Sequence, residues 1–412
     1  MSSLHSQHRE FANPAVVAKL LQPLPKAVLQ AAAEQAGWDQ WSRKITFQPY
    51  FRLQLLLALT RYTTLREVQW ASQHDPLFAR HGARLEVSVP ALSLVPERRG
   101  AAPFLTVLAP VLAAVQALPH RSRRARGLTT ATLKSIQELL VRTQIVDSTT
   151  CSLPPAVAQW ARTQPTGDSA GYKLHLRLAG GYGGVAQFSF SPAREHDSPH
   201  LDPLVTELQA GDLLLVDRGY LDYERFDQWT ARGIGFVSKL RQNHTDEVLW
   251  ERDLENRPLE NGYVLLREQR VRLGGTAREG EAEYRLLDVL TPEGKRETLV
   301  TNLWEITPEQ IVALAQYRWT VETVFRWLKQ TLGLAHLIST KKEGVEIQIA
   351  MALLVYALLI LYQRGDPNWS PKYLRLELNV QLQRAYAAYV FELGRAGLPP
   401  PPELEGCLLA YS

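Results

Sequence analysis

Short apolar segments that each contain or end in a single carboxylate constrain the fold of this chain more than any other feature. From Gln144 onward, segments rich in branched and aromatic residues alternate with turn residues, a pattern typical of strands. One such segment carries Asp147, and a later one runs directly into Asp217. An ionised carboxylate buried at a strand costs several kcal/mol unless cations or hydrogen bonds compensate. The two aspartates are therefore candidates for a functional site, although either one alone could also be a turn-capping residue.

The order of the expected elements favours a mixed α/β sheet flanked by helices. Three consecutive strands come first, and then a helix, a strand, a helix and a strand. Consecutive strands followed by alternating helices and strands are typical of a sheet with both antiparallel and parallel neighbours. The segments are strands Gln144–Thr149, Tyr172–Leu178 and Val185–Phe190, helix Pro203–Leu208, strand Asp212–Val216, helix Tyr223–Ala231 and strand Ile234–Leu240.

The residues before this sheet are expected to be helical. Residues 14–140 show apolar residues at three- and four-residue spacing, and Thr64 with Glu67 three residues later predicts a capped helix start. A further helix start at Ser88 would give either a helix-turn-helix or a small helical bundle, in which Pro96 should keep the second helix very short. The other helical segments are Ala15–Leu29, Phe51–Tyr62, Thr64–Ser72 and Phe104–Leu118.

The residues after the sheet change pattern twice. Residues 243–303 contain alternating segments such as Tyr263–Leu273, which predict a β-rich insertion. A long helix over roughly Pro308–Leu332 and an apolar helix around Ile347–Tyr362 follow. The predicted organisation is a basic helical domain (1–143), a catalytic α/β domain in two parts (144–242 and 304–365) interrupted by the insertion (243–303), and a C-terminal helical tail (366–412).

Composition excludes several classes of protein. Hydrophobic residues make up 45% and charged residues 21%, which is ordinary for a chain with a buried core and argues against disorder. The longest apolar run, Ile349–Tyr362, is too short to span a membrane, and the N-terminus lacks the apolar stretch of a signal peptide. The two cysteines fit a reducing compartment. We expect a cytoplasmic protein with no membrane partner.

Positive charge gathers in the N-terminal third. Residues 1–146 hold 18 Lys and Arg against 8 Asp and Glu, whereas the remaining residues hold 28 against 34. This asymmetry predicts a polyanionic partner for the N-terminal third. The densest basic cluster, which could also be a solvated linker, comprises Arg121, Arg123, Arg124 and Arg126.

A third carboxylate, Glu322, lies in the long helix expected near the C-terminus. At about 100° per residue, Arg318, Glu322 and Lys329 fall within roughly 40° of one another, and apolar residues occupy a different face. Such a stripe could be an exposed set of ion pairs, since Arg318 and Glu322 are four residues apart. That reading does not account for the aspartates at two strands.

Three carboxylates contributed by two strands and a packed helix predict a divalent-metal site. Mg²⁺ prefers oxygen ligands and keeps several waters, so that a few carboxylates and phosphate oxygens suffice. Two such ions roughly 3.5–4 Å apart can activate a water and stabilise the leaving oxygen of a phosphodiester. Arg318 and Lys329 would then hold a phosphate backbone.

Three motifs resemble bacterial insertion-sequence transposases of the DDE type. They are Val-Asp-Ser around Asp147, Asp-Arg-Gly-Tyr at Asp217, and Arg318-Trp-x-x-Glu322-x6-Lys329. They are similar to the group with a YREK signature and a β insertion, the IS-four family. The resemblance implies an RNase H-like sheet whose adjacent first and fourth strands bring the two aspartates together. It also implies that Asp147, Asp217 and Glu322 are the catalytic residues and bind Mg²⁺ or Mn²⁺, as two ions.

The same resemblance implies cut-and-paste transposition, with nicking at element ends, a hairpin intermediate and strand transfer. Its partners would be double-stranded DNA, as terminal inverted repeats and target, and a second copy of the chain in a homodimer at the bacterial nucleoid. The signature tyrosine corresponds to Ala315 here, and Tyr317 stands beside the arginine instead. Trp250 and Trp304 are the nearest candidates for holding a flipped base.

Other polar and aromatic residues are weaker candidates. Tyr317 and Trp319 flank Arg318 and would contact DNA, although a tryptophan on such a helix often packs. Alternation along one strand puts Lys173 and His175 on one face, where they would contact DNA. The pair His196 and Asp197 would be either auxiliary site residues or a solvated pair in a loop.

Two other functions remain open on the sequence. One is a domesticated or inactive relative that binds DNA ends without cutting them. The other is a carboxylate-pair hydrolase that acts on sugars and needs no metal. The basic N-terminal third and the stripe of Arg318 and Lys329 argue against the sugar hydrolase.

Overall fold

The structure is a computed structural model that describes residues 23–365, with gaps at 41, 43, 60–61, 76–77, 79–81, 119–127, 155–157, 164–168, 182, 242–245, 275–281 and 335. The chain divides into two compact units. Unit 1 comprises Met1–Ala114 and Leu328–Ser412, and unit 2 comprises Val115–Trp327. The boundaries of these two units differ from those of the five expected segments. Residues from 328 onward belong to the same unit as the N-terminal helices. The five segments stay a prediction.

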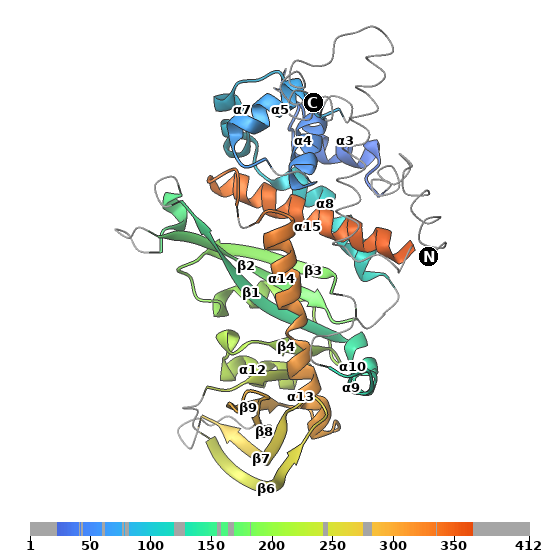
Figure 1. The fold of residues 1–412 in the computed structure, drawn as a ribbon, viewed down its shortest axis with the longest axis vertical. Helices are drawn as coiled ribbons and strands as arrows, with labels where there is room; N and C mark the ends of the chain where they lie inside the picture. Colours follow the sequence, from blue (N-terminus) through green and yellow to red (C-terminus); the bar gives the residue numbers. More distant parts are fainter. Residues whose placement is uncertain are drawn as a thin grey trace, which may run out of the picture. The chain divides into compact units, whose positions relative to one another are not determined.

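Unit 2 is built on a nine-stranded mixed sheet in the order β3-β2-β1-β4-β5-β9-β8-β7-β6 (Figure 1). Strands β1, β2 and β3 pair antiparallel, whereas β4 pairs parallel with β1 and β5 pairs parallel with β4. The expected RNase H-like mixed sheet is therefore confirmed, with its first and fourth strands side by side. The strands are β1 Thr143–Leu153, β2 Ala170–Ala179, β3 Val185–Pro192, β4 Leu213–Val216, β5 Gly235–Lys239, β6 Asp246–Pro258, β7 Val264–Leu273, β8 Tyr284–Leu290 and β9 Arg296–Thr301.

Short helices cover the middle of this sheet. The helix α12 (Tyr223–Ala231) begins at Asp222, whose side chain accepts a hydrogen bond from the Glu224 amide. Its Phe226 ring stacks on Phe236 of β5 with centroids 4.2 Å apart. Strand β4, Leu-Leu-Leu-Val, is buried along its whole length, as its apolar sequence predicts for a central strand. The smaller α11 (Asp202–Val205) precedes β4.

The residues expected to form a β-rich insertion do form strands, β6 to β9, and these strands extend the same sheet. Strand β9 pairs antiparallel with β5, and β8, β7 and β6 follow outward. The outermost strand, β6, is mostly exposed and shifts register between Val248 and Trp250 and again between Asp253 and Arg257. Around the second shift, Glu255 and Asn256 take positive φ values of 56° and 51°.

The single long helix expected over Pro308–Leu332 is two helices, α13 (Pro308–Tyr317) and α14 (Thr320–Thr331). At the break, the Trp319 and Val321 amides bond to carbonyls three residues back, and the Thr320 hydroxyl donates to the Tyr317 carbonyl. These local bonds replace the four-residue pattern of a continuous α-helix. Arg318 therefore ends one helix and Glu322 lies in the first turn of the next, so that a helical wheel drawn through both is wrong.

Unit 1 is a group of helices around an aromatic core. The capping box expected at Thr64 and Glu67 is present at the start of α5, and α7 continues through Pro96 to Arg99, so the expectation of a very short helix there is wrong. Trp38 packs against Phe47, Tyr50 and Phe104. The helices are α3 Lys26–Gln35, α4 Phe47–Leu59, α5 Leu65–His74, α7 Val89–Arg99, α8 Ala102–Gln116 and α15 Lys342–Gly365.

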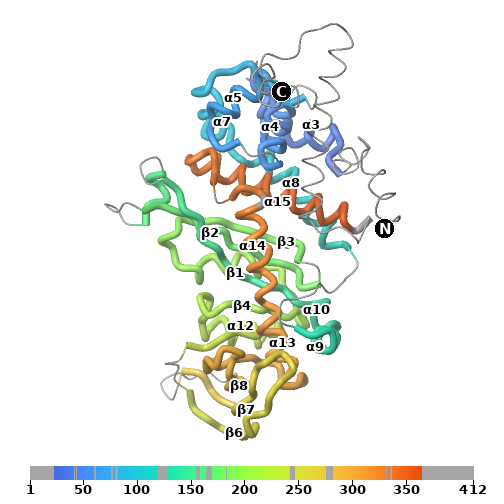
Figure 2. Tube along the Cα trace, viewed as in Figure 1, coloured from blue at the N-terminus to red at the C-terminus, as the bar shows by residue number. Residues whose placement is uncertain are grey.

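The apolar helix α15 packs with these N-terminal helices although it is far from them in sequence. It contacts α4 and α7, and in the trace of Figure 2 the orange-red α15 lies beside the blue α4. In the described part of the chain, Lys342–Gln363 is the one helix long and apolar enough to cross a membrane by length and composition, and 83% of its apolar window is buried. The helices α7 and α8 would be long and apolar enough only if they were taken as one span, and they are bent by 69° relative to each other. The expectation of a buried helix is confirmed.

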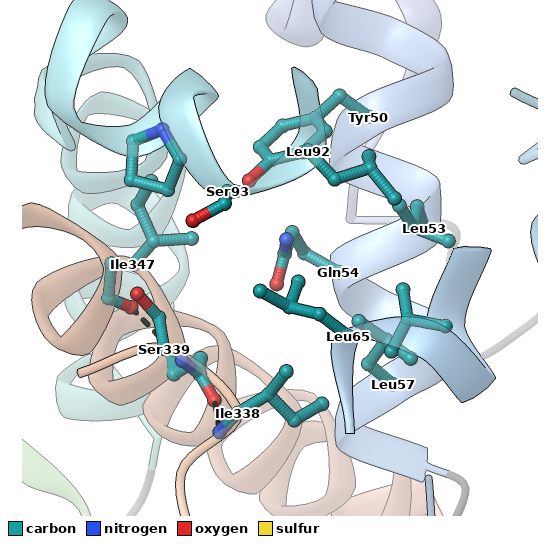
Figure 3. Close-up of a pocket in the computed structure, with 14 residues that line it drawn as sticks. Tyr50, Leu53, Gln54, Leu57, Leu65, Leu92, Ser93, Ile338, Ser339 and Ile347 are labelled. Atoms are coloured by element: carbon teal, nitrogen blue, oxygen red, sulfur yellow. Dashed lines mark hydrogen bonds between the residues drawn. The ribbon is translucent and has the colours of Figure 1, made fainter. Parts of the chain in front are cut away.

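A small cavity lies between α4, α7 and α15 in unit 1 (Figure 3). Its volume is about 30 Å³, and Tyr50, Gln54 and Ser93 are among its polar lining. Gln348 of α15 accepts a hydrogen bond from the Ile338 amide at 2.8 Å beside it. The space suffices for about one water molecule, so the cavity is no ligand site.

Candidate active site

Two neighbouring parallel strands place the two aspartates next to each other. Val146 of β1 and Val216 of β4 are register partners, so the residues that follow them, Asp147 and Asp217, lie at adjacent positions. Asp147 lies within β1 with its side chain 14% exposed, whereas Asp217 follows the end of β4 with its side chain 35% exposed. Adjacent positions on parallel strands bring the side chains to the same region of the sheet.

Arg318 joins these aspartates to the glutamate. Its Nη1 lies 2.6 Å from Asp147 Oδ2, and its Nη2 lies 3.5 Å from Asp217 Oδ1 and 3.9 Å from Glu322 Oε1. One guanidinium, only 8% exposed, thus contacts all three carboxylates that the motifs single out. The structure therefore brings Asp147, Asp217 and Glu322 together.

The neighbouring Tyr317 fixes the place from which Arg318 reaches the carboxylates. Its side chain is buried, and its hydroxyl donates a hydrogen bond to the Gly180 carbonyl at 2.5 Å. Gly180 directly follows β2, and its amide donates to Thr143 at the start of β1. The end of α13 is thereby attached to the two strands beside the site. Tyr317 itself is enclosed, so the structure does not support the expected contact with DNA.

The surroundings of Asp147 disfavour its ionised form. Burial raises the pKa of Asp147 to about 6, although the Arg318 guanidinium and the Ser148 amide act in the opposite direction. The nearby carboxylates of Asp217 and Glu322 raise the pKa of Asp147 further. Three carboxylates against one guanidinium leave the site short of positive charge, which is typical of functional sites.

The donor set fits a divalent cation in its chemistry. Carboxylate oxygens are the ligands that Mg²⁺ prefers, and the excess of negative charge favours a further cation. Among the residues that the structure describes, however, no three His, Cys, Asp or Glu side chains are arranged closely enough to hold one metal ion. Arg318 is the cation that the three carboxylates share here. Binding of an ion by all three would require them to exchange this arginine for it.

The other residues expected to contact DNA are placed differently. His175 is fully buried, with its ring nitrogens bonded to the Tyr220 hydroxyl at 3.1 Å and to Ser191 at 3.0 Å, so the structure does not support a DNA contact there. Alternation correctly put His175 and Lys173 on one face, but the sequence did not reveal that other residues cover that face. Arg318 is likewise turned onto carboxylates instead of toward solvent.

The remaining candidates are exposed, engaged elsewhere or outside the described residues. Trp319 is 49% exposed and keeps its expected role as a hypothesis. Trp250 and Trp304 are also exposed, and each has an arginine over its ring. Lys329 belongs to unit 1, whereas the carboxylates belong to unit 2, and its role stays a prediction. The basic cluster of Arg121, Arg123, Arg124 and Arg126 lies outside the described residues.

Sequence reasoning missed the hydrogen-bonded residues that surround the aspartates. Tyr220 is buried and bonds to His175, and Ser148 donates both its amide to Asp147 and its hydroxyl to Asp197. Both residues follow one of the two candidate aspartates within the quoted motifs, which is the signal that could have identified them.

Comparison with known proteins agrees with this geometry. The family described as "Transposase DDE domain" matches residues 141–358, more than half of the chain. The match begins just before β1 and includes all three carboxylates and Arg318. It also covers the strands β6 to β9.

Several transposases of insertion sequences are similar to the chain. A probable transposase of the element IS5377 from Geobacillus stearothermophilus is 28% identical over 52% of this chain and 55% of its own length. A transposase of IS231C from Bacillus thuringiensis subsp. berliner is 24% identical over 50% of this chain and 53% of its own. The chain thus spans about half the length of these curated relatives.

Among solved structures, the piggyBac transposase synaptic complex with hairpin DNA aligns with a TM-score of 0.49 at 8% identity, over 92% of this chain and 82% of that one. This likeness is too weak to support an inference. The family match rests instead on the extent of sequence that carries the strands and the three carboxylates. The chain belongs to the transposase DDE domain family.

Proposed function

We propose that the chain is the transposase of a bacterial insertion sequence and cuts and joins DNA with a divalent metal. The observation that carries this proposal is the convergence of Asp147, Asp217 and Glu322 on one guanidinium. Asp147 and Glu322 are far apart in the sequence, yet both lie with Asp217 around the same arginine at the RNase H-like sheet. The family membership and the similar insertion-sequence transposases support the same function.

In this proposal the three carboxylates hold Mg²⁺ or Mn²⁺, as two ions. When bound, the metal supplies a Lewis acid that lowers the pKa of water and stabilises the leaving oxygen. Asp147 would bind the metal from the central strand β1. The Ser148 amide orients its carboxylate by donating a hydrogen bond to Oδ1, with N and Oδ1 2.8 Å apart. Arg318, once released from the carboxylates, supplies positive charge for a DNA phosphate, which restores its expected role.

The finer assignments belong to the same proposal. The reaction would follow the cut-and-paste route of the IS-four group, with end nicking, a hairpin intermediate and strand transfer into target DNA. The substrate would be double-stranded terminal repeats, held by a homodimer in the bacterial cytoplasm. The exposed side chains of Trp250, Trp304 and Trp319 are candidates for holding an unstacked base.

The test compares two glutamates that occupy the first turns of different helices. Glu322→Gln removes charge from the site, whereas Glu224→Gln changes an exposed first-turn residue of α12. The substrate is a labelled duplex that carries the inverted repeats flanking the gene, assayed with Mg²⁺ and with EDTA. We expect Glu322→Gln to bind this duplex normally and to lose cutting, and Glu224→Gln to cut like the wild type.

Two results would contradict the proposal. If the Glu322→Gln variant cut DNA at the normal rate, Glu322 would not be a residue of the active site. Binding of the duplex by the wild type with no cutting in Mg²⁺ or Mn²⁺ would favour an inactive relative, for which the Ala315 departure from the signature is the supporting observation.

A further inference from the structure

A fourth carboxylate, Asp197, lies beside the three of the candidate site. It is in the loop after β3, and its side chain is 22% exposed. Its Oδ1 accepts a hydrogen bond from the Ser148 hydroxyl at 3.1 Å and lies 3.0 Å from Lys173 Nζ. Ser148 is the residue that also orients Asp147 through its amide. Asp197 is therefore one hydrogen-bonded step from the first catalytic aspartate.

Asp197 also adjoins the second catalytic aspartate. A Cβ built on Gly219 would lie 3.1 Å from Asp197 Oδ2 and 4.0 Å from Asp217 Oδ2, so the two carboxylates flank the same backbone position. The same turn ends at Tyr220, whose hydroxyl bonds to His175. The loop of Asp197 is thus packed against the turn that holds Asp217.

The contacts of Asp197 reach two neighbouring strands, β1 and β2. Ser148 belongs to β1, and Lys173 and His175 belong to β2. His175 Nδ1 lies 4.0 Å from Asp197 Oδ1, and its ring stacks on His200 with centroids 4.6 Å apart. Lys173 Nζ is held in addition by the Glu195 carbonyl at 2.7 Å. Lys173, which the sequence assigned to DNA, is thus directed at a carboxylate of its own protein.

A purely structural role explains this arrangement poorly. A further carboxylate next to a cluster already short of positive charge adds repulsion, which Lys173 only offsets. A neutral hydrogen-bond acceptor would satisfy Ser148 without that cost. Residues that orient metal ligands, in contrast, gain from carrying charge, because they fix the direction of the ligands and strengthen their interaction with the ion.

We propose that Asp197, paired with Lys173, is a positioning residue of the DDE site, which holds Ser148 and the Gly219 turn so that Asp147 and Asp217 present their oxygens to the metal. The proposal rests on the proposed function. It assigns no contact with metal or DNA to Asp197 itself.

The test measures Mn²⁺ affinity by isothermal titration calorimetry on the full chain, alongside DNA cutting and the midpoint of thermal unfolding. Changes in residues that orient metal ligands typically cost 10- to 100-fold in metal affinity or activity. We expect Asp197→Ala to weaken Mn²⁺ binding by about 10- to 100-fold. Asp197→Asn, which keeps an acceptor for Ser148 at 3.1 Å but loses the charge paired with Lys173, should recover only part of this loss. The matched control is Asp202→Ala, five residues later and 65% exposed.

A double-mutant cycle with Ser148→Ala tests the route of the effect. Ser148→Ala should weaken Mn²⁺ binding in the same direction, and the double variant should lose little more than either single one, because both remove the same contact. Gly219→Ala should give a smaller loss, since its Cβ would press on Asp197 Oδ2. Strictly additive losses would overturn the proposed route.

The outcomes separate this inference from the proposed function. If wild type binds Mn²⁺ and cuts DNA while Asp197→Ala does both equally well, the positioning role is wrong. An equal loss in Asp197→Asn and Asp197→Ala would make Asp197 a metal ligand and overturn positioning. A lower unfolding midpoint with unchanged Mn²⁺ affinity would make it only structural. If wild type neither binds Mn²⁺ nor cuts, while it binds the inverted-repeat duplex, the proposed function fails and this inference fails with it.

Discussion

Two aspartates of the same sheet, the half-buried Asp147 on β1 and the buried Asp288 on β8, are compensated in opposite ways. Around Asp288, Arg267 and Arg296 donate to Oδ2 at 2.9 and 2.8 Å, and Thr298 donates to Oδ1 at 2.6 Å. Desolvation acts to raise the pKa of Asp288, but these hydrogen bonds outweigh it, so that its pKa lies below the ordinary value. Around Asp147, three carboxylates share one arginine, and the pKa is raised to about 6.

The difference lies in how far the surroundings favour the ionised form of each carboxylate, and it agrees with a functional role proposed for Asp147. Asp288 receives hydrogen bonds from two arginines and a threonine, which makes its ionised form a favourable part of the β7–β9 region. Asp147 receives less than it needs, so its ionised form is costly until a further cation arrives. Undercompensated carboxylates of this kind are characteristic of binding and catalytic sites. The comparison therefore supports the proposed cation site without reference to any motif.

The largest effect is expected from removing the arginine that pairs with the carboxylates around Asp147. Arg318→Met removes the cation shared by three carboxylates, and loss of one partner of a buried ion pair typically costs about 3–5 kcal/mol. We expect the free energy of unfolding of the metal-free protein to fall by about that amount in urea denaturation. Arg326→Met, an exposed position on α14, is the control. Equal stabilities of the two variants would show that the carboxylates do not depend on Arg318.

A smaller loss is expected at the overcompensated aspartate. Asp288→Asn removes the charge that receives hydrogen bonds from two arginines, and bonds to charged groups contribute about 1.5–3 kcal/mol. The free energy of unfolding at pH 7 should fall by about 2–3 kcal/mol, measured by the same denaturation. Cutting of DNA by a refolded sample should persist. A stabilised Asp288→Asn protein would abolish the contrast between the two aspartates.

The smallest effect has the opposite sign and depends on pH. The Asp147 carboxyl binds its proton more tightly in the folded protein than in the unfolded chain. The stability gained from this proton is fully present below pH 3.8 and is lost as the pH rises through about 6. Asp147→Asn should therefore stabilise the metal-free protein at pH 7.5, by about 1–2 kcal/mol, with the gain disappearing near pH 4. Paired unfolding curves at the two pH values provide the measurement. A variant less stable than wild type at pH 7.5 would mean that the Arg318 contact outweighs burial.

Local features of this chain were predictable from local patterns. The capping box at Thr64 and the helix Tyr223–Ala231 follow from side chains that act within one turn, and both are present as expected. The mixed order of strands and helices was readable from periodicity. The adjacency of Asp147 and Asp217 came from the family resemblance, because strand order depends on contacts between distant segments.

Features that depend on distant contacts were not predictable. The pattern around Arg318 keeps helical periodicity through the break between α13 and α14, so only the local bonds of Thr320 and Trp319 reveal it. The alternation of Lys173 and His175 defines a face of β2 but not what covers it. The packing of α15 against α4 joins residues almost 300 positions apart, and periodicity within either helix carries no information about its partner.

The irregular outer strand β6 has a consequence for the behaviour of the protein at high concentration. An outermost strand exposes backbone groups that can pair with the same strand of another molecule and start aggregation. Strand β6 shifts register twice, takes positive φ at Glu255 and Asn256, and carries charged residues along most of its exposed length. Each feature makes a flat, continuous pairing between two molecules unfavourable. The nine-stranded sheet thus ends in a strand whose irregular backbone is poorly suited to pairing with a second molecule, although its exposed Val248, Leu249 and Trp250 are apolar.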